Sequence, residues 1–316
     1  MRNISFVIPC YRSEKTIVDV VDEIKATMSS QIKDSYEIIL INDCSPDNTI
    51  DVLKNIAANN NHITVIDMAK NFGQHAALMA GIRQSKGDIV VCLDDDGQTP
   101  PAEVYKLIDK LDDFDVCYAS YEQKKHSIFR NIGSKINDKM LEIMLDKPRT
   151  LYVSSYFAMK RYIADEVVKY TNPYPYIMGL VLRSTNSITS APVIHKERTS
   201  GKSGYSVSKL LSLWINGFTA FSVKPLRIAS LMGILCAVIG IIFSIWAIIN
   251  KLTNPLAPLG WTTLIIVLLI IGGMILFVLA LLGEYVGRMY ISMNNSPQYV
   301  IKAYYGCVVD KELDKE

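Results

Sequence analysis

The sequence predicts an α/β fold with a mostly parallel sheet, followed by a two-helix transmembrane hairpin. Three features indicate this fold class. Strand and helix patterns alternate over the first half of the chain, one buried strand ends in three aspartates, and two long uncharged segments lie near the C-terminus. Repeated strand–helix units favour a parallel sheet with helices on both faces. Apolar segments of about 20 residues are long enough to cross a bilayer.

Hydrophobic periodicity places the elements of the first hundred residues. We expect strands over residues 4–8, 36–41, 63–68 and 89–93, and helices over 16–28, 49–57 and 76–83. Right-handed crossovers between parallel strands place all strand C-termini at one edge of the sheet. The residues that follow three of these strands, 9–11, Asp43 and 94–96, should therefore share one crevice.

Asp94, Asp95 and Asp96 directly follow the last of these strands. Adjacent carboxylates repel one another, and a hard divalent cation with oxygen ligands would hold them together. Asp94 and Asp96 can approach one ion, and the amide of Gln98 could add an oxygen. Mg²⁺ and Mn²⁺ bind through one or two carboxylates plus substrate phosphates, so the cluster implies a phosphorylated substrate. The alternative is a solvated acidic turn before a helix, because the proline pair that follows suits a first helical turn.

Charge and hydropathy divide the chain into a soluble part and a membrane part. A net charge of +2 over 316 residues gives no signal for nucleic-acid binding. We expect a juxtamembrane amphipathic helix over 206–225, transmembrane helices over 226–250 and 260–283, and a cytoplasmic tail over 284–316. Basic residues gather before the first span and after the second, so the positive-inside rule places both termini in the cytoplasm.

A basic amphipathic helix is expected at about residues 123–144. Its isoleucines and methionines repeat at helical spacing, and its basic residues include Arg130 and Lys135. This pattern is typical of a helix that lies at a membrane surface. A surface helix packed on the sheet would show the same pattern, so both interpretations stay open.

Four short motifs end or follow the expected strands. They are Val7-Ile8-Pro9-Cys10-Tyr11, Asn42-Asp43-Cys44-Ser45-Pro46-Asp47-Asn48-Thr49, Lys70-Asn71-Phe72-Gly73 and Asp94-Asp95-Asp96-Gly97-Gln98-Thr99-Pro100-Pro101. Their order and spacing resemble those of family-2 glycosyltransferases of the GT-A fold. With the C-terminal hairpin, the chain resembles the polyprenyl-phosphate members of that family, bactoprenol glucosyltransferases and dolichol-phosphate mannose synthases. The resemblance covers about residues 4–299 and implies a cytoplasmic GT-A domain with a Rossmann-like sheet over 1–205.

The resemblance also implies roles for individual residues. The nucleotide would be bound by Pro9, Tyr11, Glu14, Asp43, Gly73 and Asp95. Asp94, Asp95 and Asp96 would be catalytic, with Mg²⁺ or Mn²⁺ at Asp94, Asp96 and Gln98. The segment 198–205 matches the family's arginine-to-tyrosine motif, so acceptor phosphate would be bound by Arg198, Lys202 and Ser203, with Arg130 and Lys135 as further candidates. The alternative for this basic segment is the positive-inside signal alone.

Four positions depart from the family pattern. Asn42 stands where the family often has a second Asp, and Cys44 stands where it often has Gly. Ser155 and Phe157 occupy positions where bactoprenol glucosyltransferases usually carry Asp and Arg. These departures leave the sugar open more than the reaction.

The implied reaction is inverting transfer of a hexose from a nucleotide sugar, expected to be a UDP-sugar, to a membrane polyprenyl phosphate, expected to be undecaprenyl phosphate. Its product would serve cell-surface glycan modification, at an inner membrane crossed by two spans. Homo-oligomerisation stays open. One alternative is a processive polysaccharide synthase, which normally needs more than two spans. Another is a non-catalytic scaffold that binds nucleotide sugar, against which the intact carboxylate cluster argues.

Overall fold

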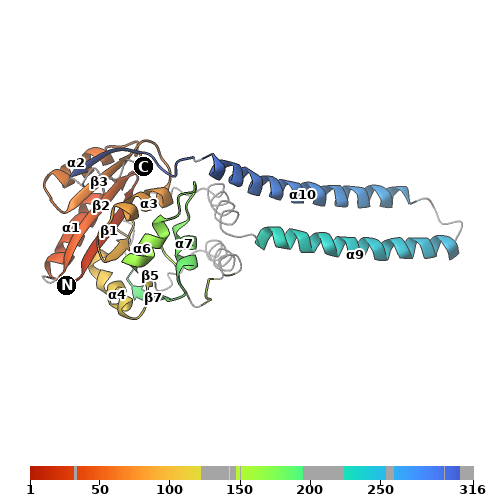
Figure 1. Ribbon diagram of the computed structural model, residues 1–316, viewed down its shortest axis with the longest axis horizontal. Helices are drawn as coiled ribbons and strands as arrows, with labels where there is room; N and C mark the ends of the chain where they lie inside the picture. Colours follow the sequence, from red (N-terminus) through yellow and green to blue (C-terminus); the bar gives the residue numbers. More distant parts are fainter. Residues whose placement is uncertain are drawn as a thin grey trace. The chain divides into compact units, whose positions relative to one another are not determined.

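The computed structural model describes residues 1–31, 34–121, 142, 147–149, 151–194, 224–253, 260–294 and 296–306. The chain forms two compact units. One comprises Met1–Ser206 together with Ser296–Glu316, and the other comprises Val207–Asn295. The first unit is built on a sheet and the second on two long helices (Figure 1).

The sheet of the first unit has eight strands among the described residues, in the order β7-β5-β6-β4-β1-β2-β3-β8. They are β1 (Asn3–Cys10), β2 (Ser35–Asn42), β3 (Ile63–Met68), β4 (Ile89–Cys92), β5 (Val116–Tyr121), β6 (Phe157–Lys160), β7 (Ile188–Val193) and β8 (Ile301–Gly306). Neighbours among β1 to β4 run parallel, as do β5 and β7. Strand β6 runs antiparallel to β4 and β5, and β8 runs antiparallel to β3. The expectation of a mostly parallel sheet is confirmed.

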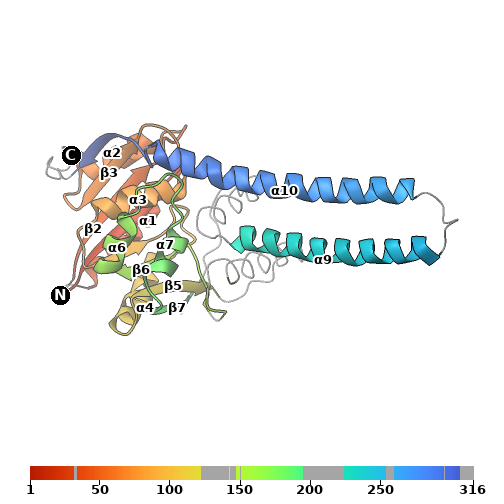
Figure 2. The ribbon, with the colours of Figure 1, turned by 45° about the vertical axis from the view of Figure 1, so that its right-hand side comes forward.

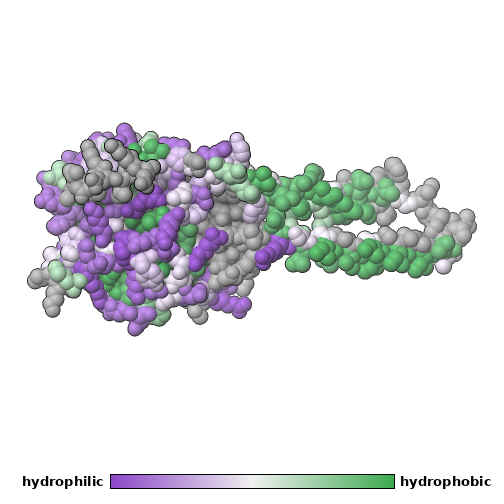
Figure 3. Space-filling model, in the orientation of Figure 1, coloured by the Kyte–Doolittle hydropathy of each residue, from purple (hydrophilic) through white to green (hydrophobic). Residues whose placement is uncertain are grey.

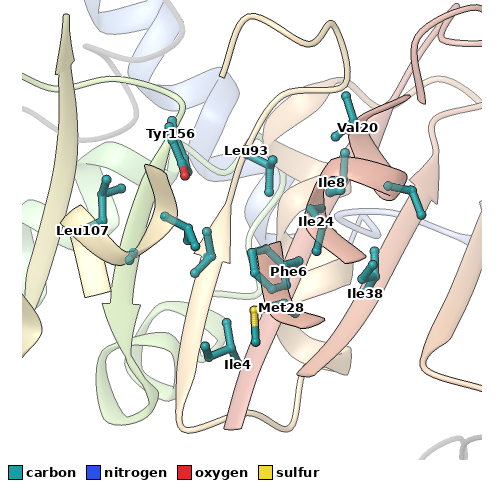
Figure 4. Close-up of a cluster of buried hydrophobic side chains, with 14 of the residues drawn as sticks. Ile4, Phe6, Ile8, Val20, Ile24, Met28, Ile38, Leu93, Leu107 and Tyr156 are labelled. Atoms are coloured by element: carbon teal, nitrogen blue, oxygen red, sulfur yellow. The ribbon is translucent and has the colours of Figure 1, made fainter. Parts of the chain in front are cut away.

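Helices cover both faces of this sheet (Figures 1 and 2). They are α1 (Ile17–Ser29), α2 (Thr49–Ala58), α3 (Gln74–Gln84), α4 (Val104–Ile108), α6 (Arg161–Val168) and α7 (Ile177–Ser184), with 3-10 turns at Pro101–Glu103 and Asp109–Asp112. On one face, Ile4, Phe6 and Ile8 of β1 pack in one core cluster with Ile24 and Met28 of α1 (Figure 4). The opposite face is covered by α3, so strands β1 to β3 are buried on both sides. This burial explains why their sequences are nearly continuous apolar runs.

Helix α3 approaches the sheet closely at Gly81. A Cβ atom at this position would lie 2.4 Å from Cγ1 of Val7 and 2.7 Å from Cδ1 of Ile41. Only glycine fits without displacing these side chains, because closely packed interiors leave no such space. The close packing fixes α3, and with it the loop that precedes its first residue, against β1 and β2.

The C-terminal residues differ from the expected tail over 284–316. Helix α10 continues to Met293, and β8 then pairs with β3 at the edge of the sheet. Burial alternates along β8, with Ile301, Ala303 and Tyr305 half-buried and the residues between them exposed. This two-residue alternation is the pattern of a strand with one covered face. The chain therefore returns to the first unit after the helical one.

The second unit contains α9 (Lys224–Thr253) and α10 (Trp261–Met293), which contact each other. Their described side chains are largely apolar and exposed (Figure 3), for example Leu268, Leu276 and Phe277. Among the described residues, one stretch is long and apolar enough to span a membrane, the 24 residues Ile270–Met293 with a mean hydropathy of 2.1. A shorter apolar stretch, Ala229–Phe243, lies in α9. The expected basic helix at 123–144, apart from residue 142, and residues 206–223 of the expected juxtamembrane helix lie outside the described residues.

Candidate active site

The acidic cluster lies at the C-terminal edge of the sheet, as the sequence predicts. Strand β4 ends at Cys92, and the Leu93 N–H still donates to the Val7 carbonyl of β1 at 3.3 Å. The three aspartates follow at once. Gly97 then reverses the chain with a φ of +73°, a conformation that glycine adopts without steric cost. The Gln98 N–H donates to Asp96 Oδ1 at 3.0 Å, which closes the turn.

Asp94 is held from both sides by neutral donors. The Gln74 side-chain amide, at the start of α3, donates to Asp94 Oδ1 at 2.8 Å. The Ser155 hydroxyl, just before β6, donates to Asp94 Oδ2. The pKa of Asp94 is raised to about 6, mainly by burial and also by the charges of Asp96 and Asp95, while the two hydrogen bonds oppose the shift. The cluster is thus oriented by hydrogen bonds that the sequence did not predict.

Asp95 points toward the loop after β1. Its Oδ2 accepts the Tyr11 N–H at 3.0 Å and the hydroxyl of Ser13. Burial raises the pKa of Asp95, and these two donors oppose the shift. Asp94 and Asp95 therefore turn toward different elements, and each carboxylate has its own donors. Asp95 thereby fixes the backbone of Tyr11.

Asp43 binds the loop that begins α3. Its Oδ1 accepts the Phe72 N–H at 2.7 Å, and its Oδ2 accepts the Gly73 N–H at 2.9 Å. The Asn71 amide donates to the Asp43 carbonyl at 3.1 Å. Burial raises the pKa of Asp43, and the two backbone donors oppose the shift. Asp43 thus joins the end of β2 to Gly73, whose φ is +90°.

The other expected nucleotide-site residues surround this junction. Tyr11 is 45% exposed, so its ring is accessible to a ligand, and the Arg12 guanidinium carbon lies 5.6 Å from the ring centroid. Glu14 Oε2 accepts the Asn48 N–H at 3.2 Å, which ties the β1 loop to the β2 loop. Pro9 is buried in β1 opposite Ile41.

The expected metal ligands are Asp94, Asp96 and Gln98. No group of three or more His, Cys, Asp or Glu side chains gathers in metal-binding geometry within the part of the chain that the structure describes. Asp96 and Gln98 share one turn, and a carboxylate oxygen can accept a donor and still coordinate a cation through its second lone pair. The residues present therefore suit a hard cation that completes its coordination with substrate oxygens. The acceptor candidates Arg130, Lys135, Arg198, Lys202 and Ser203 lie outside the described residues.

Sequence reasoning missed three side chains at this site. Gln74 directly follows the Lys70-to-Gly73 motif, so its position in the chain was a usable signal. Ser155 departs from the family pattern in sequence, and its hydrogen bond to Asp94 gives it a role. Tyr121, at the end of β5, has its pKa raised by burial and by the nearby charge of Asp94. No local pattern marked Tyr121.

Comparison with known proteins establishes the family. Residues 5–168 match the sequence family described as glycosyl transferase family 2, and residues 224–289 match the GtrB C-terminal hairpin. The chain belongs to glycosyl transferase family 2. It is 30% identical to an uncharacterized glycosyltransferase, YkcC, of Bacillus subtilis over 99% of this chain and 97% of the relative.

Other relatives carry more specific names. An undecaprenyl-phosphate 4-deoxy-4-formamido-L-arabinose transferase of Klebsiella pneumoniae is 31% identical over 96% of this chain and 93% of its own length. Among solved structures, glucosyl-3-phosphoglycerate synthase of Mycobacterium tuberculosis, in complex with Mn²⁺ and UDP-glucose, superimposes with a TM-score of 0.53 at 18% identity, over 69% of this chain and 77% of that one. This likeness concerns the fold and confirms the expected GT-A arrangement.

Proposed function

We propose that this protein transfers a hexose from a UDP-sugar to a membrane polyprenyl phosphate, undecaprenyl phosphate, with inversion at the anomeric carbon. The main support for the proposal is that one chain combines a sheet edge lined by carboxylates with an apolar helical hairpin. The sheet edge suits a water-soluble nucleotide sugar, and the hairpin suits an enzyme whose second substrate is a lipid. Relatives named as undecaprenyl-phosphate sugar transferases, which match nearly the whole chain, support the acceptor class.

The nucleoside would bind between Tyr11 and Asp43. The exposed Tyr11 ring offers a face for the base, and the Tyr11 backbone is fixed by Asp95. Asp43 keeps lone pairs beyond those used by Phe72 and Gly73, so it can accept a hydrogen bond from the uracil imide. Asp94, Asp96 and Gln98 would hold Mg²⁺ or Mn²⁺. Such a cation, when bound, neutralises the diphosphate and assists its departure as a Lewis acid.

The acceptor needs positioning more than activation. A phosphomonoester has a second pKa of about 6 and is largely dianionic at neutral pH, so its oxygen needs no strong general base. This oxygen attacks the anomeric carbon on the face opposite UDP. The new oxygen–carbon bond forms as the bond to the β-phosphate oxygen breaks, and UDP leaves with the electron pair. Arg198, Lys202 and Ser203 remain our candidates for holding the lipid phosphate, with Arg130 and Lys135 next.

The chain connectivity supports a membrane topology with both termini on the same side, and the distribution of basic residues favours the cytoplasm as that side. Residues before and after the hairpin belong to one folded unit, because β8 pairs with β3. A chain that crosses a membrane and returns to the same unit makes an even number of crossings. We propose two, through α9 and α10, in the inner membrane, and the glycolipid product would supply cell-surface glycan modification.

The test incubates the purified full chain with labelled UDP-sugars, Mg²⁺ or Mn²⁺ and undecaprenyl phosphate. We expect label in a short glycolipid with one sugar of the panel. Asp96→Asn should abolish the product. The control Asp22→Asn should not, because Asp22 is an exposed carboxylate on α1 that pairs with Lys25 of the same helix. Label in a polymer would indicate the processive synthase, and bound but unreacted UDP-sugar would indicate the scaffold.

A further inference from the structure

A buried polar pair joins the ends of β2 and β3. Asn42 and Asp67 are register partners on these strands, with exposed fractions of 3% and 4%. The Asn42 side-chain amide donates to Asp67 Oδ1 at 2.7 Å. An aspartate at position 42, which the family often has, would place two buried carboxylates against each other. Asn42 therefore suits a chain that carries an aspartate at position 67.

Strand β8 brings a positive charge to this pair. Lys302 Nζ lies 3.6 Å from Asp67 Oδ2, and the Lys302 side chain is 68% exposed. The register of β8 on β3 shifts between Asp67 and Met68, which is where the lysine meets the carboxylate. The positive partner of a buried carboxylate is thus supplied by residues that follow the hairpin in sequence.

The other end of the Asn42 side chain closes the turn that carries Asp43. Because the amide nitrogen faces Asp67, the amide oxygen faces the opposite way and accepts the Ser45 N–H at 3.2 Å. Cys44, inside this turn, has a φ of +50°, a backbone conformation that is unfavourable for residues other than glycine. The Ser45 hydroxyl oxygen in turn accepts the Arg12 N–H at 2.7 Å, next to Tyr11.

We propose that Lys302, Asp67 and Asn42 are positioning residues through which β8 orders the nucleoside site at Tyr11 and Asp43. The inference rests on the proposed function, because it concerns the UDP half of the donor. Lys302 holds Asp67, Asp67 sets the orientation of the Asn42 amide, and Asn42 holds the turn. Donor binding then depends on the chain segment that returns from the membrane hairpin.

The first measurement is UDP affinity by calorimetry, on the full chain in detergent with Mg²⁺. We expect Lys302→Met and Asp67→Asn each to weaken binding about two- to fivefold, the range for a largely exposed ion pair. The double variant should bind no more weakly than Asp67→Asn alone, and Lys302→Arg should restore binding. The Lys302→Met effect should shrink as salt rises, because an exposed charge is screened. Lys54→Met is the matched control, because Lys54 also contacts β8: its Nζ lies 4.8 Å from the centroid of the Tyr305 ring.

The second measurement is hydrogen exchange of the ligand-free chain, which does not depend on UDP. We expect residues 42–49 to exchange faster in Lys302→Met than in the parent, and Lys54→Met to match the parent. Parent-like affinity and exchange in Lys302→Met would overturn the inference. The inference would also be overturned if Lys302→Met and Lys54→Met lost UDP affinity equally and in proportion to the fall in their thermal midpoints. Additive losses of UDP affinity in the double variant would overturn it as well. A parent that fails to bind UDP while Lys302→Met still exchanges faster would refute the proposed donor and leave the ordering of the turn supported.

Discussion

Asp43→Asn tests whether one carboxylate holds the nucleotide side of the site together. Each Asp43 oxygen accepts one backbone N–H, from Phe72 at 2.7 Å and from Gly73 at 2.9 Å, and the residue is 4% exposed. Asparagine has the same shape but one acceptor oxygen, so its NH₂ group must face one of the two N–H donors. One partly buried backbone donor then loses its partner.

The magnitude follows from the hydrogen bond that is lost. A hydrogen bond to a charged group contributes about 1.5–3 kcal/mol. For a domain of this size, a loss of that free energy of unfolding lowers the thermal midpoint by roughly 3–12 °C. If the same interaction also fixes the loop for the nucleotide, UDP affinity should fall about 10- to 100-fold.

The assay pairs thermal unfolding of the full chain in detergent with UDP calorimetry, for the parent, Asp43→Asn and the surface control Asp22→Asn. The control should match the parent in both measurements, because an exposed pair within one helix contributes little. An Asp43→Asn variant with the midpoint and UDP affinity of the control would refute the role of this carboxylate. A lowered midpoint at unchanged UDP affinity would restrict the role to folding.

Three further outcomes are expected. Asp96→Asn should lose turnover by at least about a hundredfold while keeping the parent's thermal midpoint, and near-normal turnover with normal metal dependence would remove Asp96 from the metal site. A single cysteine at position 254, in a variant without the native thiols, should react with an impermeant reagent in intact cells. Protection at position 254 together with labelling of the C-terminal tail would show that the topology is the reverse of the one proposed. Because the pKa of Asp94 is raised from 3.8 to about 6, the folded chain holds a proton that the unfolded chain releases, so this group's contribution to stability falls as pH rises from about 4 to 6. Thermal midpoints with EDTA should therefore show a shallower decline over that window in Asp94→Asn, and identical slopes would contradict the shift.

The sequence by itself determined the sheet edge and its chemistry. Strand-length apolar runs, separated by helical spacing, require parallel strands with crossovers, and parallel strands end at one edge. The structure agrees, because Cys10 pairs with Asn42 at the C-terminal ends of β1 and β2. Asp43 and the acidic cluster after β4 therefore lie at the same edge of the sheet. The long uncharged segments likewise indicated the hairpin, because segment length and charge are local properties.

Only the tertiary structure decided how the side chains at that edge are paired. Asp94 turns toward Gln74 and Ser155, whereas Asp95 turns toward Tyr11, and adjacent positions in sequence gave no reason for the difference. The same holds for β8, whose Lys302 meets an aspartate more than 200 residues earlier in the chain. Periodicity records which face of an element is buried, and it holds no information about which distant partner covers that face. That choice is made by packing and hydrogen bonding between elements, which exist only when the whole sheet has formed.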